Sequence, residues 1–275
     1  MLGAVVFPLT SNVIIETYKM KNNRRRRQLS EIQVKFSQGL VFRNRDDVIR
    51  QEIAQFISAE SGFTLGDAPH FWWLSRNFVE AFVSWQNLSS LGLVEQGQRT
   101  GIADDRKSAL YHWLATAPAS ERHLAMEAYD RGSIELIDRI YSRLQLVRDE
   151  KFAMRRRAYA ANLVLSESPR IIDVAKRMKV TWLQPGQMDG SRLKKLLRDV
   201  PTYCAEIELA VRIESMNRPI NRNDLGDMQG FVSAIPYSDV VIGENLFVNL
   251  ARQAGFDRKY GCKLETDLFA IEKYL

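Results

Sequence analysis

The chain has 275 residues and a formal net charge of +6, a length that can bury a substantial core. Cys204 and Cys262 lie far apart without a CxxC pattern, which excludes a disulfide framework and a cysteine-based zinc site and favours a reducing, cytoplasmic setting. Pro8 and several polar residues interrupt the first apolar run, and no basic segment precedes it, so a signal peptide and a membrane span are excluded as well.

The first quarter of the chain alternates between buried strands and helices. The pattern predicts a strand over residues 3–7, helices over 12–20 and 24–38, a strand over 40–43 and a helix over 47–57. Thr10 or Ser11 caps the first of these helices, Gly39 ends the second, and Asp46 or Asp47 opens the third. Such an order is typical of a parallel sheet covered by helices.

The sequence pattern in the middle of the chain predicts mostly helices. Residues 69–87, PHFWWLSRNFVEAFVSWQN, favour an apolar helix, and nearly everything from 104 to 215 is helical with breaks at prolines and glycines. No fixed-period repeat and no Gly/Ser linker appears. Residues 61–215 are therefore interpreted as a helical insertion that packs on the sheet rather than as a tethered module.

The alternation of strands and helices returns near the C-terminus. The pattern predicts a helix over residues 223–235, a strand over 238–243, a helix over 244–255, an edge strand over 262–264 and a helix over 265–274. Because sheet residues then come from both ends of the chain, the two ends are expected to fold together into one α/β domain.

Acidic residues gather around the predicted strand in NDLGDMQGFVSAIPYSDVVIGENLF, residues 223–247. Asp224 and Asp227, three residues apart, either share one helix face for chemistry or form a capping box that only stabilises the helix start. Glu244 either stands at the carboxyl end of the strand, where parallel sheets bind ligands, or favours the positive end of the next helix dipole. Asp239 enters the same strand.

Glu16 follows the first predicted strand in the same way as Glu244 follows its own. Carboxylates that converge on one edge of a sheet repel each other, and they stay ionised only around a cation. The pattern therefore favours Mg²⁺ or Mn²⁺ held by oxygen ligands and metal-assisted phosphodiester cleavage.

The segment 223–247, with its helix-borne acids, its Pro-Tyr-Ser-Asp, its apolar strand and its terminal acid, resembles the last active-site segment of PIN-like nuclease domains. The opening VVFPLTSNVIIET and the two helices after it resemble the second strand and following helices of that class. The resemblance implies an α/β, PIN-like three-layer fold with a short parallel sheet. Residues 1–60 plus 216–275 would form its core, and residues 61–215 would be a large helical insertion.

The resemblance assigns roles to the acids. Glu16, Asp227 and Glu244 would be catalytic, and Asp224 and Asp239 would join them as ligands of Mg²⁺ or Mn²⁺. The implied activity is that of a toxin-type or stress ribonuclease that cleaves single-stranded RNA, with an antitoxin or similar inhibitor protein as partner.

The chain departs from the family at one point, and this departure leaves two alternatives for its activity. PIN-like domains begin with a strand that ends in aspartate, and no acid precedes Glu16 here. Either the native start lies upstream of Met1 and the enzyme is complete, or the chain is a catalytically incomplete module that binds nucleic acid or protein.

Basic residues are unevenly distributed. Residues 151–198 hold 12 Lys and Arg against 3 Asp and Glu, whereas residues 199–275 hold 8 against 12. A basic surface beside an acidic pocket suits a nuclease, although a basic run is also what a solvated helix face shows. The candidates for phosphate contact are Arg24, Arg25, Arg26, Arg27, Arg155, Arg156, Arg157, Lys194 and Lys195.

Overall fold

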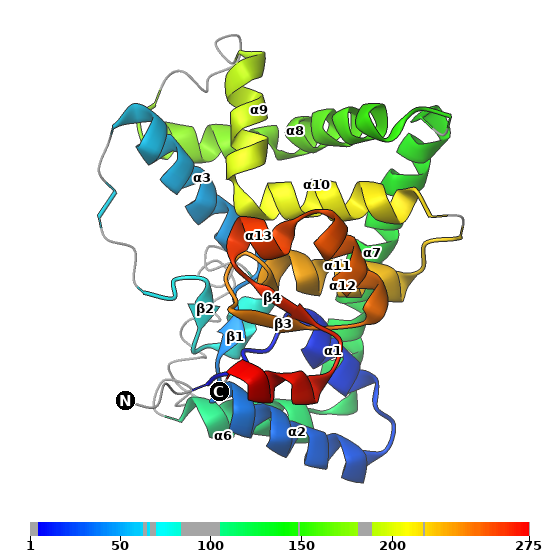
Figure 1. The fold of residues 1–275 in the computed structure, drawn as a ribbon. Coiled ribbons are helices and arrows are strands. Elements are labelled where there is room, and N and C mark those ends of the chain that lie inside the picture. The colour runs from blue at the N-terminus through cyan, green and yellow to red at the C-terminus, as the bar shows by residue number, and fades with distance from the viewer. Residues whose placement is uncertain are drawn as a thin grey trace. The chain divides into compact units, whose positions relative to one another are not determined.

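The computed structural model describes residues 5–62, 65–66, 70–83, 105–147, 149–180, 189–216 and 218–274. Of the described residues 70% are helical and 5% lie in strands, and these strands form two sheets of two strands each (Figure 1). The expected three-layer α/β fold built on a parallel sheet is therefore wrong.

The first part of the chain contains α1 (Ser11–Lys19), α2 (Asn23–Ser37), β1 (Val41–Phe42), α3 (Arg45–Ser61), β2 (Leu74–Ser75), the 3-10 helix η1 (Phe78–Ala81), α6 (Arg106–Thr116) and α7 (Ala119–Val147). The second part contains α8 (Phe152–Arg177), α9 (Gly190–Asp199), α10 (Pro201–Glu214), α11 (Arg222–Ala234), β3 (Val240–Ile242), α12 (Asn245–Gln253), α13 (Phe256–Tyr260), β4 (Lys263–Glu265) and η2 (Leu268–Tyr274).

The chain divides into two compact units. The first unit comprises Met1–Asp47, Phe71–Glu135 and Glu272–Leu275, and the second comprises Val48–His70 and Leu136–Ile271. Each unit has its own apolar core, with Ile14, Ile15 and Leu110 fully buried in the first and Tyr203 and Phe247 almost fully buried in the second.

In the first unit α2 packs along α6, and α1 contacts both helices. The predicted cap of α1 is confirmed, because the Thr10 side chain accepts a hydrogen bond from the Val13 N–H. The predicted end of α2 is confirmed too, since Gln38 and Gly39 both adopt positive φ angles, 54° and 75°. These helices follow from caps and periodicity that the sequence carries locally.

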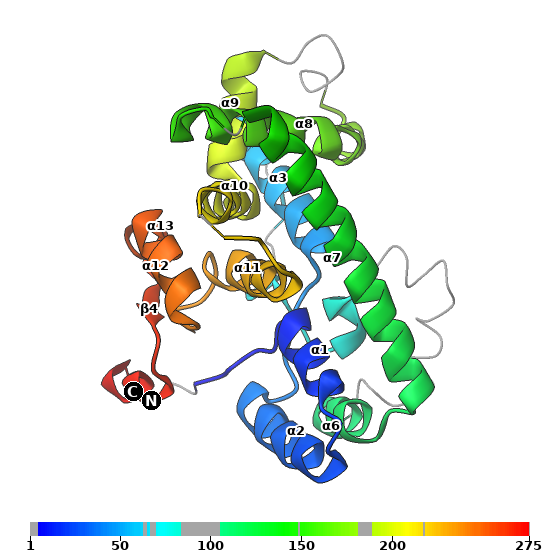
Figure 2. The same cartoon turned by 90° about the vertical axis from the view of Figure 1, so that its right-hand side faces the viewer.

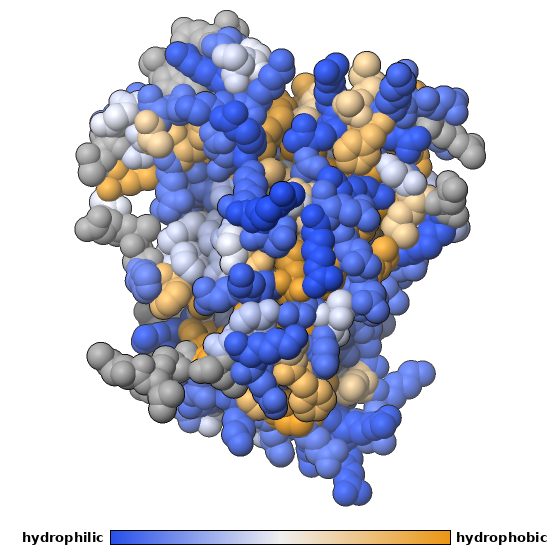
Figure 3. All heavy atoms as spheres, viewed as in Figure 1, coloured by the Kyte–Doolittle hydropathy of each residue, from blue (hydrophilic) through white to orange (hydrophobic). Residues whose placement is uncertain are grey.

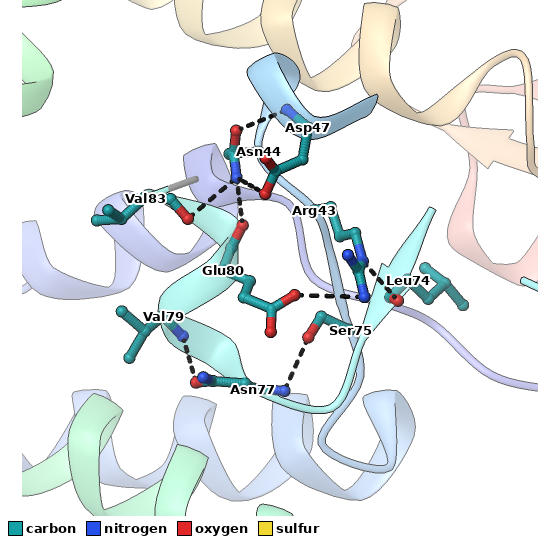
Figure 4. A network of polar contacts seen from close by, with 9 residues as sticks. All are labelled: Arg43, Asn44, Asp47, Leu74, Ser75, Asn77, Val79, Glu80 and Val83. Carbon is teal, nitrogen blue, oxygen red and sulfur yellow. Dashed lines mark hydrogen bonds and ion pairs between the residues drawn. The ribbon is translucent and has the colours of Figure 1, made fainter. Parts of the chain in front are cut away.

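The aromatic segment at 70–83 is not the predicted helix (Figure 4). Its backbone bonds to the segment around β1 instead, since the Arg43 N–H donates to the Trp73 carbonyl at 2.9 Å and the Asn44 N–H to the Glu80 carbonyl at 2.7 Å. The Asn44 side chain also donates to the Glu80 and Val83 carbonyls, both at 3.1 Å. Carbonyls used in this way cannot build a helix, so the segment forms β2 and the short η1. The outer residues 69 and 84–87 of the prediction lie outside the described part.

The predicted pairing of strands from the two chain ends does not occur among the described strands. β1 pairs antiparallel with β2, with Val41 opposite Ser75, and β3 pairs only with β4. The described residues of the first predicted strand, 5–7, form no strand, and one bridge joins Leu9 to Val41. Residues 3 and 4 lie outside the described part.

Helix α10, not a sheet, occupies the centre of the second unit. Eleven of its 14 residues are buried, and it contacts α8, α9, α11 and α12. A helix that is buried on nearly every side must be apolar all round or must pair its polar groups. In α10 both occur, since Cys204, Ala205 and Leu209 lie among buried glutamates.

The predicted helix, strand, helix and strand after residue 222 are confirmed locally, and the last predicted helix, 265–274, is instead the 3-10 helix η2 over Leu268–Tyr274. β3 and β4 run parallel, with Val241 opposite Leu264, and α12 and α13 connect them (Figure 2). Gly243 follows β3, and its N–H donates to the Glu265 carbonyl at 3.0 Å. Short parallel strands joined by a helical crossover therefore exist here, but they stand at the edge of a helical unit.

Candidate functional site

Asp224 of the predicted acidic site forms a capping box, but with Asn221 as the N-cap residue and not with Asp227 as its predicted partner. Its backbone N–H donates to the Asn221 side chain at 3.0 Å, and its carboxylate accepts the Asn221 N–H at 2.8 Å. The Arg218 guanidinium donates to both carboxylate oxygens, at 2.8 and 2.5 Å. Burial alone would raise the pKa of Asp224, but Arg218 and the Asn221 N–H hold that pKa below its ordinary value. The carboxylate is thus fully engaged within the protein.

Asp239 and Glu244 lie at opposite ends of β3. Both residues are exposed, and Asp239 bonds through its backbone carbonyl, which accepts the Lys263 N–H at 2.7 Å. At a rise of about 3.3 Å per residue, the five steps between them separate their backbones by roughly 16 Å. Two carboxylates that far apart do not coordinate the same ion.

The remaining predicted acids also have local surroundings of their own. Glu16 belongs to the first unit and forms an exposed ion pair with Lys19 at 2.6 Å. Asp227 lies half-buried on α11 in the second unit. Among the described residues, no three His, Cys, Asp or Glu side chains are grouped so that they could hold a metal ion. The predicted ligand set therefore does not fit a shared Mg²⁺ or Mn²⁺.

Glu244 stands where the sequence predicts it, just beyond the carboxyl end of β3 and at the start of α12. As the N-cap residue it accepts the Val248 N–H through its backbone carbonyl, and its side chain makes no capping hydrogen bond with described residues. Glu244 therefore has the predicted position, but no two other described acids lie close enough to form a metal site with it.

The four consecutive arginines of α2 divide into one structural residue and three exposed ones. Arg26 is 5% exposed and donates to the carbonyls of Met20 and Ala115, both at 3.3 Å. Arg24, Arg25 and Arg27 are exposed and form no ion pair with any described carboxylate. We call these three residues the arginine patch. In Figure 3 strongly hydrophilic side chains gather at the lower end of the molecule, where Figure 1 shows α2.

The electrostatics of this helix start are unfavourable without an anion. A helix N-terminus carries partial positive charge, so cations in the first turn of α2 repel it. Burial lowers the pKa of Arg26, and the nearby charges of Arg122 and Arg27 lower that pKa further. The buried Nε atoms of Arg26 and Arg122 have no hydrogen-bond partner within the described part of the chain. Positive charge is therefore concentrated here, and no carboxylate in the described part of the chain forms an ion pair with these arginines.

The basic residues of α8 and α9 are mostly occupied. Arg156 pairs with Glu208, and the Arg155 Nε donates to the Glu150 carbonyl at 3.0 Å. Lys195 of α9 pairs with Glu60. The other two predicted contacts, Arg157 and Lys194, are exposed. A solvated, ion-paired helix face accounts for most of this segment, which was the alternative to phosphate contact.

A groove of about 700 Å³ lies in the second unit between the start of α8, the end of α10 and α12. Phe152, Met216 and Leu246 supply its apolar lining, and the Arg212 guanidinium lies 5.2 Å from the centroid of the Phe152 ring. Arg212 also bonds to Glu208 and donates to the Gln253 carbonyl at 3.2 Å. Because that charge is already paired, the groove offers an anion little attraction.

Sequence reasoning missed the buried glutamates around α10. Glu52 of α3 accepts the Thr202 N–H at 3.2 and 3.1 Å, the Thr202 hydroxyl at 2.7 Å, and the Tyr237 hydroxyl. The Tyr159 hydroxyl donates to Glu206 at 3.1 Å, and the Tyr203 hydroxyl donates to a third acid, Glu167, at 3.0 Å. A signal exists for Glu52, which falls on the apolar face of Ile49, Ile53 and Phe56.

A further buried ion pair joins α7 to α10 within the second unit. Arg143 pairs with Glu214, and its guanidinium lies 4.1 Å from the centroid of the Tyr159 ring. Burial lowers the pKa of Arg143, while Tyr159 and Glu206 oppose that shift. Arg143 and Glu214 lie against each other inside the unit, so this pair joins two helices rather than offering a binding site.

Comparisons with known proteins give no relative. No protein-family model, no curated protein and no solved structure matches the chain. Of the helices in the described part, none has the length and apolar character needed to cross a membrane.

Proposed function

We propose that the protein binds single-stranded RNA through the arginine patch, Arg24, Arg25 and Arg27, at the start of α2. The observation that carries this proposal is the unbalanced positive charge there, where Arg122 and Arg27 crowd the buried Arg26. Phosphate oxygens would neutralise these guanidinium groups and the partial charge of the helix start together.

The neighbouring surface of α2 favours a single strand. Ile32 and Phe36 are 54% and 50% exposed. They follow Arg25 by seven and eleven residues, which places them on the same side of the helix as Arg25. The Phe36 ring packs edge-to-face against Phe7, with centroids 5.5 Å apart, and stays half exposed toward the end of α2. Single-strand binders use exposed aromatic rings on the same surface as arginines to stack unpaired bases while they contact the backbone. A duplex would leave that ring without a base to stack on.

Binding is measured by fluorescence anisotropy with a labelled single-stranded RNA. The triple variant Arg24→Gln, Arg25→Gln, Arg27→Gln is expected to bind at least tenfold more weakly. The matched control is Arg177→Gln, Arg192→Gln, Arg198→Gln, which removes the same charge from exposed arginines that pair with Asp173, Asp189 and Asp199. Equal weakening by both triples would mean that only net charge matters.

Two further experiments distinguish RNA binding from membrane binding and from RNA cleavage. Anionic lipid vesicles replace the RNA in one arm, because Ile32 and Phe36 beside arginines also suit a membrane surface. Binding to vesicles but not to RNA would contradict the proposal. In the other arm the RNA is incubated with Mn²⁺ or with a chelator, using wild type and Glu244→Gln. Cleavage that needs both Mn²⁺ and Glu244 would show a ribonuclease despite the dispersed acids.

A further inference from the structure

A cysteine and a lysine lie unusually close together in the second unit. The Cys204 Sγ on α10 is 2.8 Å from the Lys259 Nζ on α13. Hydrogen bonds from nitrogen to the smaller oxygen atom are commonly about 2.9–3.0 Å long, so this contact is short for a sulfur partner. Lys259 is also fixed from another side, because its Nζ donates to the Arg198 carbonyl at 2.9 Å.

The surroundings of Cys204 make its thiol more accessible to oxidants than the thiol of Cys262. Cys204 is 7% exposed beside an exposed lysine, so a small oxidant can approach the sulfur from the side of Lys259. The Tyr260 hydroxyl donates to the Pro201 carbonyl at 3.3 Å, and burial together with Cys204 raises the pKa of Tyr260, which keeps its proton. Cys262 is fully buried, and burial raises its pKa to about 11, so it stays an unreactive thiol.

We propose that Cys204 and Lys259 form a redox modification site, at which hydrogen peroxide joins the sulfur to the nitrogen through one oxygen atom. One peroxide oxidises the thiol to a sulfenic acid, with release of one water. A second peroxide oxidises the neutral lysine amine to a hydroxylamine, with release of another water. The hydroxylamine oxygen then attacks the sulfur and expels hydroxide, which leaves as a third water. The product is an S–O–N link between α10 and α13.

The link is reversible and constrains the chain. Two molecules of a dithiol supply the four electrons that return the thiol and the amine, with one water and two cyclic disulfides as products. Joining residues 204 and 259 closes a long loop of chain, which restricts the unfolded state as a disulfide does. The oxidised protein is therefore expected to unfold at a higher temperature than the reduced protein.

The test is peptide mapping by mass spectrometry on the full-length protein after peroxide treatment, with and without dithiothreitol. The expected product is a linked pair of peptides containing Cys204 and Lys259, with one added oxygen and two hydrogens fewer. Trypsin no longer cleaves after the linked Lys259. Dithiothreitol restores both separate peptides.

Two variants accompany the wild-type measurement. Lys259→Arg keeps a cation beside the sulfur but lacks the primary amine, and Cys204→Ser lacks the sulfur, so both lose the linked peptides and the rise in melting temperature. Because the wild-type result is read from mass, it does not depend on how these variants fold. Oxidised Cys204 with unmodified Lys259, a disulfide between Cys204 and Cys262, or no change would each overturn the proposal.

Discussion

At the scale of single residues, Gly243 is required by close packing. A Cβ atom at this position would lie 2.4 Å from the Phe231 Cζ and 2.5 Å from its Cε2. The Phe231 ring cannot easily move, because it is buried and packs against Phe247 with centroids 5.5 Å apart. Overpacking of a core typically costs about 1–3 kcal/mol, and Gly243→Ala is expected to lose that much unfolding free energy in urea.

Gly190 provides the matched control for this prediction. A Cβ there meets nothing within 4 Å, and the residue begins α9. Gly190→Ala is therefore expected to be neutral or slightly stabilising. An equal loss of stability in both alanine variants would mean that the contact with Phe231 is not the cause.

The lowered pKa of Asp224 is expected to make the stability of the protein depend on pH in acid. Its folded pKa is lowered, so its carboxylate stabilises the folded state above the unfolded pKa of about 3.9, and this contribution is lost as the pH falls through the folded pKa. Asp224→Asn is expected to lose stability at neutral pH and to approach the wild type in acid. Urea unfolding of both proteins at several pH values measures this difference. The exposed Asp239→Asn serves as control, and a gap that stays constant with pH would contradict the role of the Arg218 pair.

At the scale of helices, Glu52 caps α10 from another element. The N-cap residue of α10 is Val200, whose side chain cannot accept a hydrogen bond, and Pro201 follows it. Glu52 takes over this role by accepting the Thr202 N–H and hydroxyl. Its negative charge also lies at the positive end of the α10 dipole.

Replacing this carboxylate by an amide should therefore destabilise the fold. In Glu52→Gln an amide NH₂ would face the Thr202 and Tyr237 donors, and a buried unsatisfied donor costs about 1–3 kcal/mol. Glu60→Gln on the same helix breaks only the pair with Lys195, which is expected to cost below about 1 kcal/mol. Chemical denaturation compares the two. Equal losses would mean that Glu52 does not cap α10.

The same elements show what sequence can and cannot predict. Helix starts and ends at Thr10 and Gly39 depend on neighbouring residues, so the sequence predicts them. Strand β1 pairs with residues more than 30 positions away, which local sequence cannot predict. The paired residues belong to the aromatic segment, which was predicted as a helix only because it is apolar. Glu52 was missed because a single acid is normally interpreted as a surface residue, even when it falls on an apolar face.

At the scale of the whole molecule, the pattern of apolar residues predicted the order of elements near the C-terminus, whereas the three-layer α/β fold implied by the resemblance to PIN-like domains is wrong. β3, α12 and β4 follow the predicted order, and Glu244 stands at the end of β3. The sheet that would gather further acids beside Glu244 is absent from the described residues, since β3 pairs with β4 alone. Spacing along the chain does not determine which strands pair, and a metal site depends on that pairing.

The candidate interface was predicted only in part. The run at 24–27 was a candidate for phosphate contact, and the sequence could not separate Arg26 from its neighbours without the register of α2. That register places Arg26 with Ser30, Val34 and Ser37 on the buried face and leaves the arginine patch exposed. The longer basic segment at 151–198 holds more cations, but among the described residues six of them form ion pairs. Arg156 and Lys195 pair with acids from elsewhere in the chain, and four arginines pair with acids within or directly after the segment.

The salt dependence of RNA binding shows whether the arginine patch contacts phosphates. For single strands the logarithm of the binding constant falls with the logarithm of salt concentration by about 0.7 per neutralised phosphate. The Arg24→Gln, Arg25→Gln, Arg27→Gln variant should therefore have a slope about 2 units shallower than the wild type, whereas the Arg177→Gln, Arg192→Gln, Arg198→Gln control should keep the wild-type slope. An unchanged slope in the first variant would mean that the arginine patch does not contact phosphates, and it would contradict the proposed function.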